Sequence, residues 1–184
     1  MTATIFLVQT AFGFYVLAVI LRFLLQSVRA DFYNPLVQFL VRITNPPLLP
    51  LRRIVPGYRG LDLASVVLAF ALQLVEVLLV TLLLGRPLGV GGLLLLTVME
   101  LLKLLINIYL WGIIIQVVLS WINPDPRHPA ARVLAQLTAP LLRPAQRLLP
   151  PISGVDLSPM LVVVALIFLS LLLQDFLGLL AGLR

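Results

Sequence analysis

The sequence predicts an all-α membrane protein with four transmembrane helices, arranged as two tandem two-helix repeats. Each repeat is expected to contain a proline-rich interfacial loop that carries short amphipathic helices. Three observations lead to this fold class: an apolar composition, four long apolar segments, and a match of the sequence to itself. Of the 184 residues, 61% are hydrophobic and 11% are charged. Because a soluble domain of this size needs more polar residues to cover its surface, we expect lipid to surround most of the chain.

Four apolar stretches are long enough to cross a hydrocarbon layer of about 30 Å, for which a helix needs about 20 residues. They lie near residues 4–25, 61–84, 93–121 and 157–181. No Lys or Arg precedes Arg22, and no small-residue cleavage pattern follows the first stretch. We therefore expect the first stretch to be a retained span and not a signal peptide.

The connections after the first and third stretches contain twelve of the fourteen prolines. These prolines are expected to break any long helix there. Apolar residues nevertheless recur at helical spacing within each connection, which is typical of a short helix lying in the membrane interface. These residues are Leu36, Phe39, Leu40 and Ile43 in the first connection and Ala131, Leu134, Leu137 and Leu141 in the second.

The distribution of arginines predicts the orientation, because Lys and Arg in short loops stay on the cytoplasmic side. Ten arginines lie in or beside the two proline-rich connections: Arg22, Arg29, Arg42, Arg52, Arg53, Arg59, Arg127, Arg132, Arg143 and Arg147. The short connection between the second and third stretches has only Arg86, and the C-terminus has only Arg184. Both long loops are therefore expected in the cytoplasm, with the N- and C-termini on the periplasmic side.

The chain also matches itself without gaps at an offset of 94 residues. Many of the matched residues are of uncommon types. The pairs are Tyr15 and Tyr109, Asp31 and Asp125, Pro35 and Pro129, Thr44 and Thr138, Pro46 and Pro140, Pro50 and Pro144, Arg53 and Arg147, Pro56 and Pro150, Gly60 and Gly154, and Asp62 and Asp156. We therefore expect two copies of one unit, residues 1–88 and 89–184. Because each unit has two spans, the copies should be parallel repeats related by an axis along the membrane normal.

Several motifs in these copies resemble those of a known family, the YggT or YlmG family of small bacterial and plastid membrane proteins. In the first copy they are Asp31-Phe32-Tyr33-Asn34-Pro35, Thr44-Asn45-Pro46, Pro50-Leu51-Arg52-Arg53-Ile54-Val55-Pro56 and Gly60-Leu61-Asp62. In the second they are Ala139-Pro140-Leu141-Leu142-Arg143-Pro144, Arg147-Leu148-Leu149-Pro150 and Gly154-Val155-Asp156-Leu157-Ser158-Pro159. The second copy lacks the aromatic pair, so the two loops are not expected to be equivalent.

The resemblance implies a multi-pass protein of the bacterial inner membrane without catalytic residues. It associates the chain with osmotic-stress tolerance and potassium homeostasis, with cell division and nucleoid or thylakoid organisation, and with cytochrome assembly in plastids. Our leading hypothesis is a non-enzymatic protein whose loops dock lipids or partners. The alternative is a component of potassium or ion transport that acts as an oligomer. We expect membrane lipids as partners, and a homo-oligomer or a cytoplasmic or membrane protein partner stays open.

Arginines within the proline-rich loops are the candidate binding residues. They are Arg52, Arg53, Arg143 and Arg147. A guanidinium held at the membrane surface can bind a lipid phosphate or an acidic partner through two parallel hydrogen bonds. The alternative is that these arginines only set the topology and extend toward the headgroups.

Two aspartates, Asp62 and Asp156, stand just before transmembrane stretches. A carboxylate there can accept hydrogen bonds from the free amides of the first helical turn, so we expect helix capping in preference to ion coordination.

Four polar residues fall inside the second and third stretches: Glu76, Glu100, Lys103 and Asn107. A charge at the bilayer centre costs about 2.5 to 3.5 kcal/mol on insertion scales, so these groups need partners. A Glu76–Lys103 pair would neutralise two charges, and Gln73, Asn107 and Gln116 could extend it into a polar seam. This seam either lines an ion route or is purely structural.

The sequence gives no support for an enzyme, a cofactor or a metal site. Cysteine is absent and His128 is the only histidine, so thiolate chemistry and a zinc site in the membrane are not supported. The net charge of +6 comes from arginines between apolar segments and not from a soluble basic patch. We therefore expect no nucleic acid partner.

Overall fold

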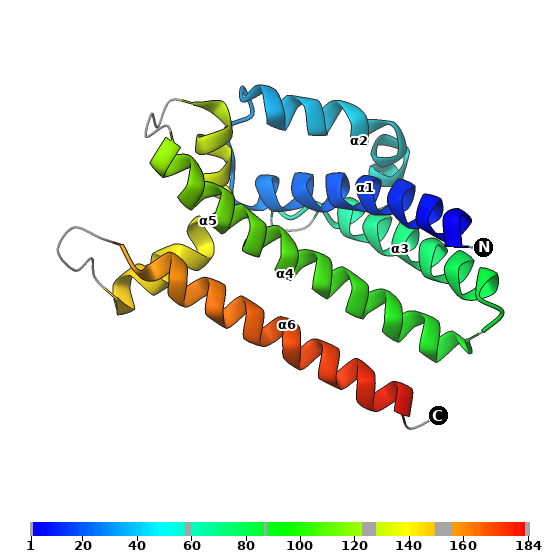
Figure 1. The fold of residues 1–184 in the computed structure, drawn as a ribbon. Coiled ribbons are helices and arrows are strands. Elements are labelled where there is room, and N and C mark those ends of the chain that lie inside the picture. Colours follow the sequence, from blue (N-terminus) through cyan, green and yellow to red (C-terminus); the bar gives the residue numbers. More distant parts are fainter. Residues whose placement is uncertain (1, 58–59, 87, 123–127, 150–155, 183–184) are drawn as a thin grey trace. The chain divides into compact units, whose positions relative to one another are not determined.

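The computed structural model describes residues 2–57, 60–86, 88–122, 128–149 and 156–182. Within these ranges the chain forms six helices (Figure 1). They are α1 (Thr2–Ser27), α2 (Pro35–Ile54), α3 (Leu63–Leu83), α4 (Val90–Ile122), α5 (Pro129–Leu148) and α6 (Ser158–Gly182).

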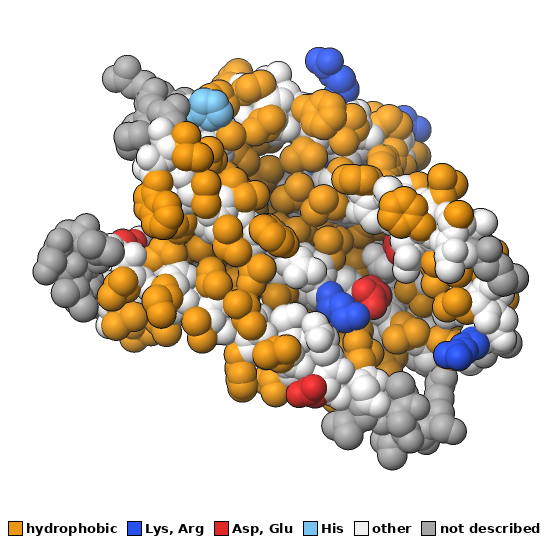
Figure 2. Space-filling model, viewed as in Figure 1, with side chains coloured by type: hydrophobic (Ala, Val, Ile, Leu, Met, Phe, Trp, Pro, Cys, Tyr) orange, Lys and Arg blue, Asp and Glu red, His pale blue; other side chains and the backbone are white. Residues whose placement is uncertain are grey.

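Four of these helices, α1, α3, α4 and α6, are long and apolar enough to cross a membrane. They confirm the four apolar spans predicted from the sequence. Many large apolar side chains on these helices are exposed, including Phe6, Phe14 and Phe168. Figure 2 shows a face covered mainly by hydrophobic side chains, with few charged ones. Such a large apolar surface is expected of a protein surrounded by lipid.

The chain divides into two compact units within α4, between Leu104 and Leu105. In the first unit α1 packs against α3, and α2 contacts both of these helices. Figure 1 shows α1 and α3 side by side. The core of this unit consists of Val16 and Val19 of α1 and Ala69 of α3, and Leu101 and Leu104 of α4 pack against it.

The second unit has a core of its own. It joins the C-terminal half of α4 to α5 and α6. Its buried residues are Ile106, Ile113, Leu142, Ala145, Val162 and Leu166. Each unit therefore holds an amphipathic helix, α2 or α5, against apolar helices.

The expectation that the prolines break any long helix in the connections is wrong. Both α2 and α5 are continuous helices of 20 residues. They include Pro46, Pro47, Pro50, Pro140 and Pro144. Each proline removes one helical hydrogen bond, and the packing of the buried helix face compensates for that loss.

One of the backbone carbonyls that lose their helical hydrogen bond at a proline accepts a hydrogen bond from another donor. Pro47 has no amide to donate to the carbonyl of Ile43, four residues earlier. The hydroxyl of Tyr15, on α1, donates to that oxygen at 3.2 Å. The contact between α1 and α2 thus stabilises the helix at the point where the proline weakens it.

Candidate functional site

A cavity of about 830 Å³ lies in the first unit. It is lined by residues of α1, of α2 and of the segment that leads into α3. Four of the lining side chains are charged, namely Arg22, Arg29, Arg52 and Asp62. Three arginines and one aspartate give the lining a net charge of plus two. Most other lining residues are apolar, such as Leu25, Phe32, Leu40 and Leu49.

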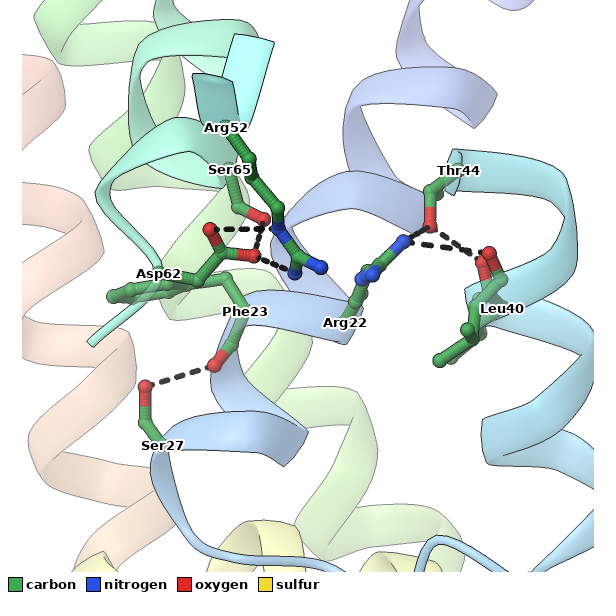
Figure 3. A network of polar contacts seen from close by, with 9 residues as sticks. Arg22, Phe23, Ser27, Leu40, Thr44, Arg52, Asp62 and Ser65 are labelled. Atoms are coloured by element: carbon green, nitrogen blue, oxygen red, sulfur yellow. Dashed lines mark hydrogen bonds and ion pairs between the residues drawn. The ribbon is translucent and has the colours of Figure 1, made fainter. Parts of the chain in front are cut away.

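Arg22 reaches this cavity from the last turns of α1, and only 6% of its surface is exposed. Its Nη1 atom donates to the hydroxyl of Thr44 at 2.7 Å (Figure 3). The same atom donates to the carbonyl of Val41 at 3.3 Å. Its Nε atom is buried without a hydrogen-bond partner among the described residues. Both acceptors are neutral, so within the described part of the chain the guanidinium of Arg22 forms no hydrogen bond to a carboxylate.

Thr44 is held in place by a second contact. Its side chain is fully buried on α2, and its hydroxyl lies 2.6 Å from the carbonyl of Leu40, one turn earlier. The hydroxyl proton can therefore go to Leu40 while the oxygen accepts from Arg22, which orients this part of the site.

Asp62 is the carboxylate among the residues that line the cavity, and it is 4% exposed. Arg52 forms an ion pair with it, and the hydroxyl of Ser65 donates to it at 2.7 Å (Figure 3). Burial alone would raise the pKa of Asp62, but the hydrogen bonds from Arg52 and Ser65 outweigh this effect and hold the pKa below its ordinary value. Asp62 is therefore charged at neutral pH, and its charge is neutralised by the ion pair with Arg52.

The capping interaction predicted for Asp62 is not what the structure shows. Asp62 does stand immediately before α3, yet its side chain makes no capping hydrogen bond to the helix amides. The carboxylate is bound by the Arg52 guanidinium and the Ser65 hydroxyl instead, because a charged donor binds it more strongly than an amide does. Asp156, in contrast, accepts the amide of Ser158 at 2.9 Å, where α6 begins. Hydrogen bonding from Ser158, followed by that from Gln146, lowers the pKa of Asp156.

The four loop arginines predicted to bind ligands fall into two groups. Arg52 is half-buried and lines the cavity. Arg53 on α2 and Arg143 and Arg147 on α5 are exposed. The structure thus separates one arginine of the site from three at the surface.

The polar residues inside the apolar helices are paired differently from the prediction. Lys103 contacts Glu100 at 2.8 Å on α4, and Gln73 donates to Glu76 at 3.1 Å on α3. The hypothesis of a Glu76–Lys103 ion pair is therefore wrong. A partner three residues away on the same helix is reached without any tertiary arrangement, which favours these local pairs. Asn107 is exposed.

Two residues of the cavity, Arg22 and Arg29, were not among the candidates predicted from the sequence. Arg29 has a φ of 53°, a left-handed conformation that a residue with a side chain rarely adopts. The amide of Ala30 donates to the carbonyl of Leu25 at 2.8 Å, which makes this turn a helix C-terminus of the Schellman type. Glycine is the usual residue at this position of a helix end. An arginine in its place at the end of the first apolar stretch is the feature of the sequence that could have indicated Arg29 as a functional residue.

Neutral side chains occupy the matching positions 94 residues later. Thr138 is fully buried on α5, and its hydroxyl contacts Gln116 and the carbonyl of Leu134. Gln146 donates to Asp156 at 2.9 Å. Gln116 and Gln146 stand 94 residues after Arg22 and Arg52. The same two contacts are therefore made with amides in the second unit and with guanidinium groups in the first.

Comparison with known proteins decides the family. The sequence model of the CCB3/YggT family matches residues 1–83 and again residues 95–177. The chain belongs to the CCB3/YggT family. The resemblance found in the loop motifs is thereby confirmed.

Relatives of this CCB3/YggT protein cover almost its whole length. An uncharacterized Pseudomonas aeruginosa protein is 45% identical, over 98% of this chain and 93% of its own. An uncharacterized Vibrio alginolyticus protein is 37% identical, over 97% of both chains. YggT of Escherichia coli K12 is 35% identical, over 93% of this chain and 89% of its own. No solved structure matches this family member.

The described part of this YggT-family chain holds no group of three or more His, Cys, Asp or Glu side chains that could bind a metal ion. Three of the four charged residues that line the cavity are arginines, which supply permanent positive charge and directed hydrogen-bond donors.

Proposed function

We propose that this chain is a non-enzymatic protein of the bacterial inner membrane whose helices α2 and α5 dock on anionic membrane lipids at the cytoplasmic surface. Docking of this kind would support envelope organisation and tolerance of osmotic stress. The observation that carries the proposal is the outer surface of α2, where exposed arginines and exposed large apolar side chains occur together.

On α2 the exposed arginines are Arg42 and Arg53. Phe39 is 60% exposed and Ile54 is 79% exposed on the same helix. Apolar side chains can enter the headgroup region, while guanidinium groups bind the phosphates above it. Each basic residue near an anionic surface contributes about 1 kcal/mol of attraction.

Helix α5 has the same combination. Arg132, Arg143 and Arg147 are exposed, and Leu148 beside Arg147 is exposed as well. Two helices that each bind the surface weakly give a stronger attachment together, because the second binds from a high effective concentration.

We also propose that residues 1–88 and 89–184 are two copies of one unit, with both proline-rich helices in the cytoplasm and both termini in the periplasm. The bounds of α2 and α5 support the duplication, since they differ by 94 residues at both ends. The two segments matched by the family model start 94 residues apart as well. The positions of the arginines support the orientation.

The docking proposal is tested with purified full-length protein reconstituted into nanodiscs that contain phosphatidylglycerol and phosphatidylcholine. Lipids retained around the protein are quantified by mass spectrometry for the wild type and for an Arg53→Gln, Arg147→Gln double variant. We expect phosphatidylglycerol to be enriched around the wild type and its enrichment to be reduced in the variant. Equal enrichment in both proteins would exclude lipid docking by these arginines and leave a protein partner as the object of study.

Ion transport is the second candidate function. It is favoured by four polar side chains that lie within two apolar helices, Gln73 and Glu76 on α3 and Glu100 and Lys103 on α4. Potassium flux into liposomes, measured with a potassium-sensitive dye for the wild type and for Glu76→Leu, separates the two functions. Flux that is lost in the variant would support transport. Wild-type flux equal to that of empty vesicles would exclude it.

A further inference from the structure

We infer that the cavity of the first unit is a binding site for the phosphate headgroup of an anionic phospholipid. The inference deepens the docking proposal and rests on it for lipid as the source of the phosphate. It concerns Arg22, Arg29 and Arg52, whereas surface docking concerns the exposed arginines of α2 and α5.

The first step is the charge of Arg22. A buried guanidinium needs a counter-charge, because its removal from water is costly. The carboxylate of the cavity, Asp62, is bound by Arg52 and Ser65. Asp62 also attracts Arg22 electrostatically, but the hydrogen bonds of Arg22 go only to neutral oxygens, and its Nε atom has no partner among the described residues. A negative charge from outside the chain would complete this arrangement.

The second step is the conformation of Arg29. The left-handed backbone at φ 53° is unfavourable for any residue with a Cβ atom, and glycine would relieve it. Here the unfavourable residue brings a third guanidinium to the cavity. A strained backbone retained beside a charged cavity points to binding as its role.

The third step is the nature of the ligand. Three arginines and one aspartate leave an excess of two positive charges, which suits a phosphate group, and guanidinium groups bind phosphate oxygens through paired hydrogen bonds. The rest of the lining includes apolar residues such as Leu25, Leu40 and Leu61. An apolar lining next to a cationic site fits a phosphate that carries acyl chains better than it fits a free phosphate ion.

The second unit provides a natural comparison. Gln116 and Gln146 replace the two arginines while retaining the contacts to Thr138 and Asp156. Glutamine at positions 22 and 52 is thus compatible with the local geometry and removes the charge. The substitutions Arg22→Gln and Arg52→Gln are therefore conservative tests of the site.

Binding is measured by native mass spectrometry of the full-length protein in detergent, titrated with phosphatidylglycerol or phosphatidylcholine. Thermal stabilisation by inorganic phosphate forms a parallel arm. We expect the wild type to bind one phosphatidylglycerol more tightly than any phosphatidylcholine. Because each lost guanidinium removes a charge-assisted hydrogen bond, Arg22→Gln and Arg29→Gly should each weaken this binding about tenfold or more. Arg86→Gln replaces an exposed arginine outside both the cavity lining and the docking helices, so it is the matched control and should leave the affinity of this single lipid unchanged.

The outcomes separate the two proposals. Unchanged phosphatidylglycerol affinity in Arg22→Gln and Arg29→Gly would overturn the cavity site, even if Arg53→Gln, Arg147→Gln reduces lipid enrichment and so supports surface docking. Tight binding that depends on Arg22 and Arg29 would support the cavity site even if surface docking fails. Stabilisation by inorganic phosphate without any selective lipid binding would overturn the assignment to a lipid. Arg29→Gly keeps the test valid if Arg22→Gln does not fold.

Discussion

Replacement of Arg29 by glycine should make the protein more stable. Arg29 has a φ of 53° at the end of α1, and a left-handed conformation costs a residue with a Cβ atom about 1 to 2 kcal/mol. Glycine avoids that cost but gains conformational freedom in the unfolded chain, which offsets about 0.5 to 1 kcal/mol. The net expectation is a gain of about 1 kcal/mol in the free energy of unfolding.

The measurement is the midpoint of thermal unfolding in detergent without added phosphatidylglycerol, so that ligand binding does not contribute. For a chain of this size a gain of about 1 kcal/mol raises the midpoint by about 2 to 4 °C. Arg29→Ala is the control, because it removes the same charge while it retains the Cβ atom. If alanine stabilises the protein as much as glycine does, the effect comes from the charge and the reasoning from backbone strain is refuted.

Three further predictions concern the contacts of the first unit. Asp62→Asn should lower the free energy of unfolding by about 2 kcal/mol at neutral pH, because it breaks a partly buried ion pair. Since the folded-state pKa of Asp62 is below the unfolded value of about 3.9, this contribution is present above that pH and is lost as the pH falls below it. Chemical unfolding should therefore show a smaller difference in stability between the two proteins at acid pH than at pH 7, and a constant difference would contradict the prediction. Thr44→Val should lower the free energy of unfolding by about 2 kcal/mol, because it removes the acceptor of a charged donor, and Thr138→Val should lower it by about 1 kcal/mol, because it removes a neutral contact. Equal losses of stability in parallel unfolding experiments would count against the role of charge. Tyr15→Phe should cost about 1 kcal/mol of the free energy of unfolding, because it leaves the Ile43 carbonyl without its donor. Tyr109→Phe should cost less, because the Tyr109 hydroxyl makes no equivalent bond to the described residues, and the opposite order would disprove this explanation of the proline-containing helix.

The four apolar helices could be predicted from the sequence because hydropathy and length are local properties. The amphipathic pattern of α2 and α5 was also visible, but their continuity through the prolines was not. The donor that satisfies the Ile43 carbonyl is Tyr15, 28 residues earlier in the chain. A tertiary contact of this kind overrides the local tendency of proline to end a helix, and nothing in the local sequence indicates it.

The cavity could be predicted only in part for the same reason. Arg52 was a candidate because it lies in a repeated motif, but its pairing with Asp62 and the burial of Arg22 against Thr44 depend on how α1, α2 and α3 pack. From the sequence alone, Arg22 was one of ten arginines that indicate orientation. Conversely, the pairing of Glu76 with Lys103 was predicted wrongly because it assumed a contact between helices where a local contact was available to each residue.

The most direct test of the central claim, a phospholipid site lined by Arg22, Arg29 and Arg52, is the affinity of the Arg29→Gly variant for phosphatidylglycerol. The variant is expected to be more stable than the wild type and yet to bind a single phosphatidylglycerol about tenfold more weakly. A loss of binding in a stabilised protein cannot be attributed to misfolding. If the more stable variant binds this lipid as tightly as the wild type does, the cavity is not the site of the headgroup and the account is contradicted.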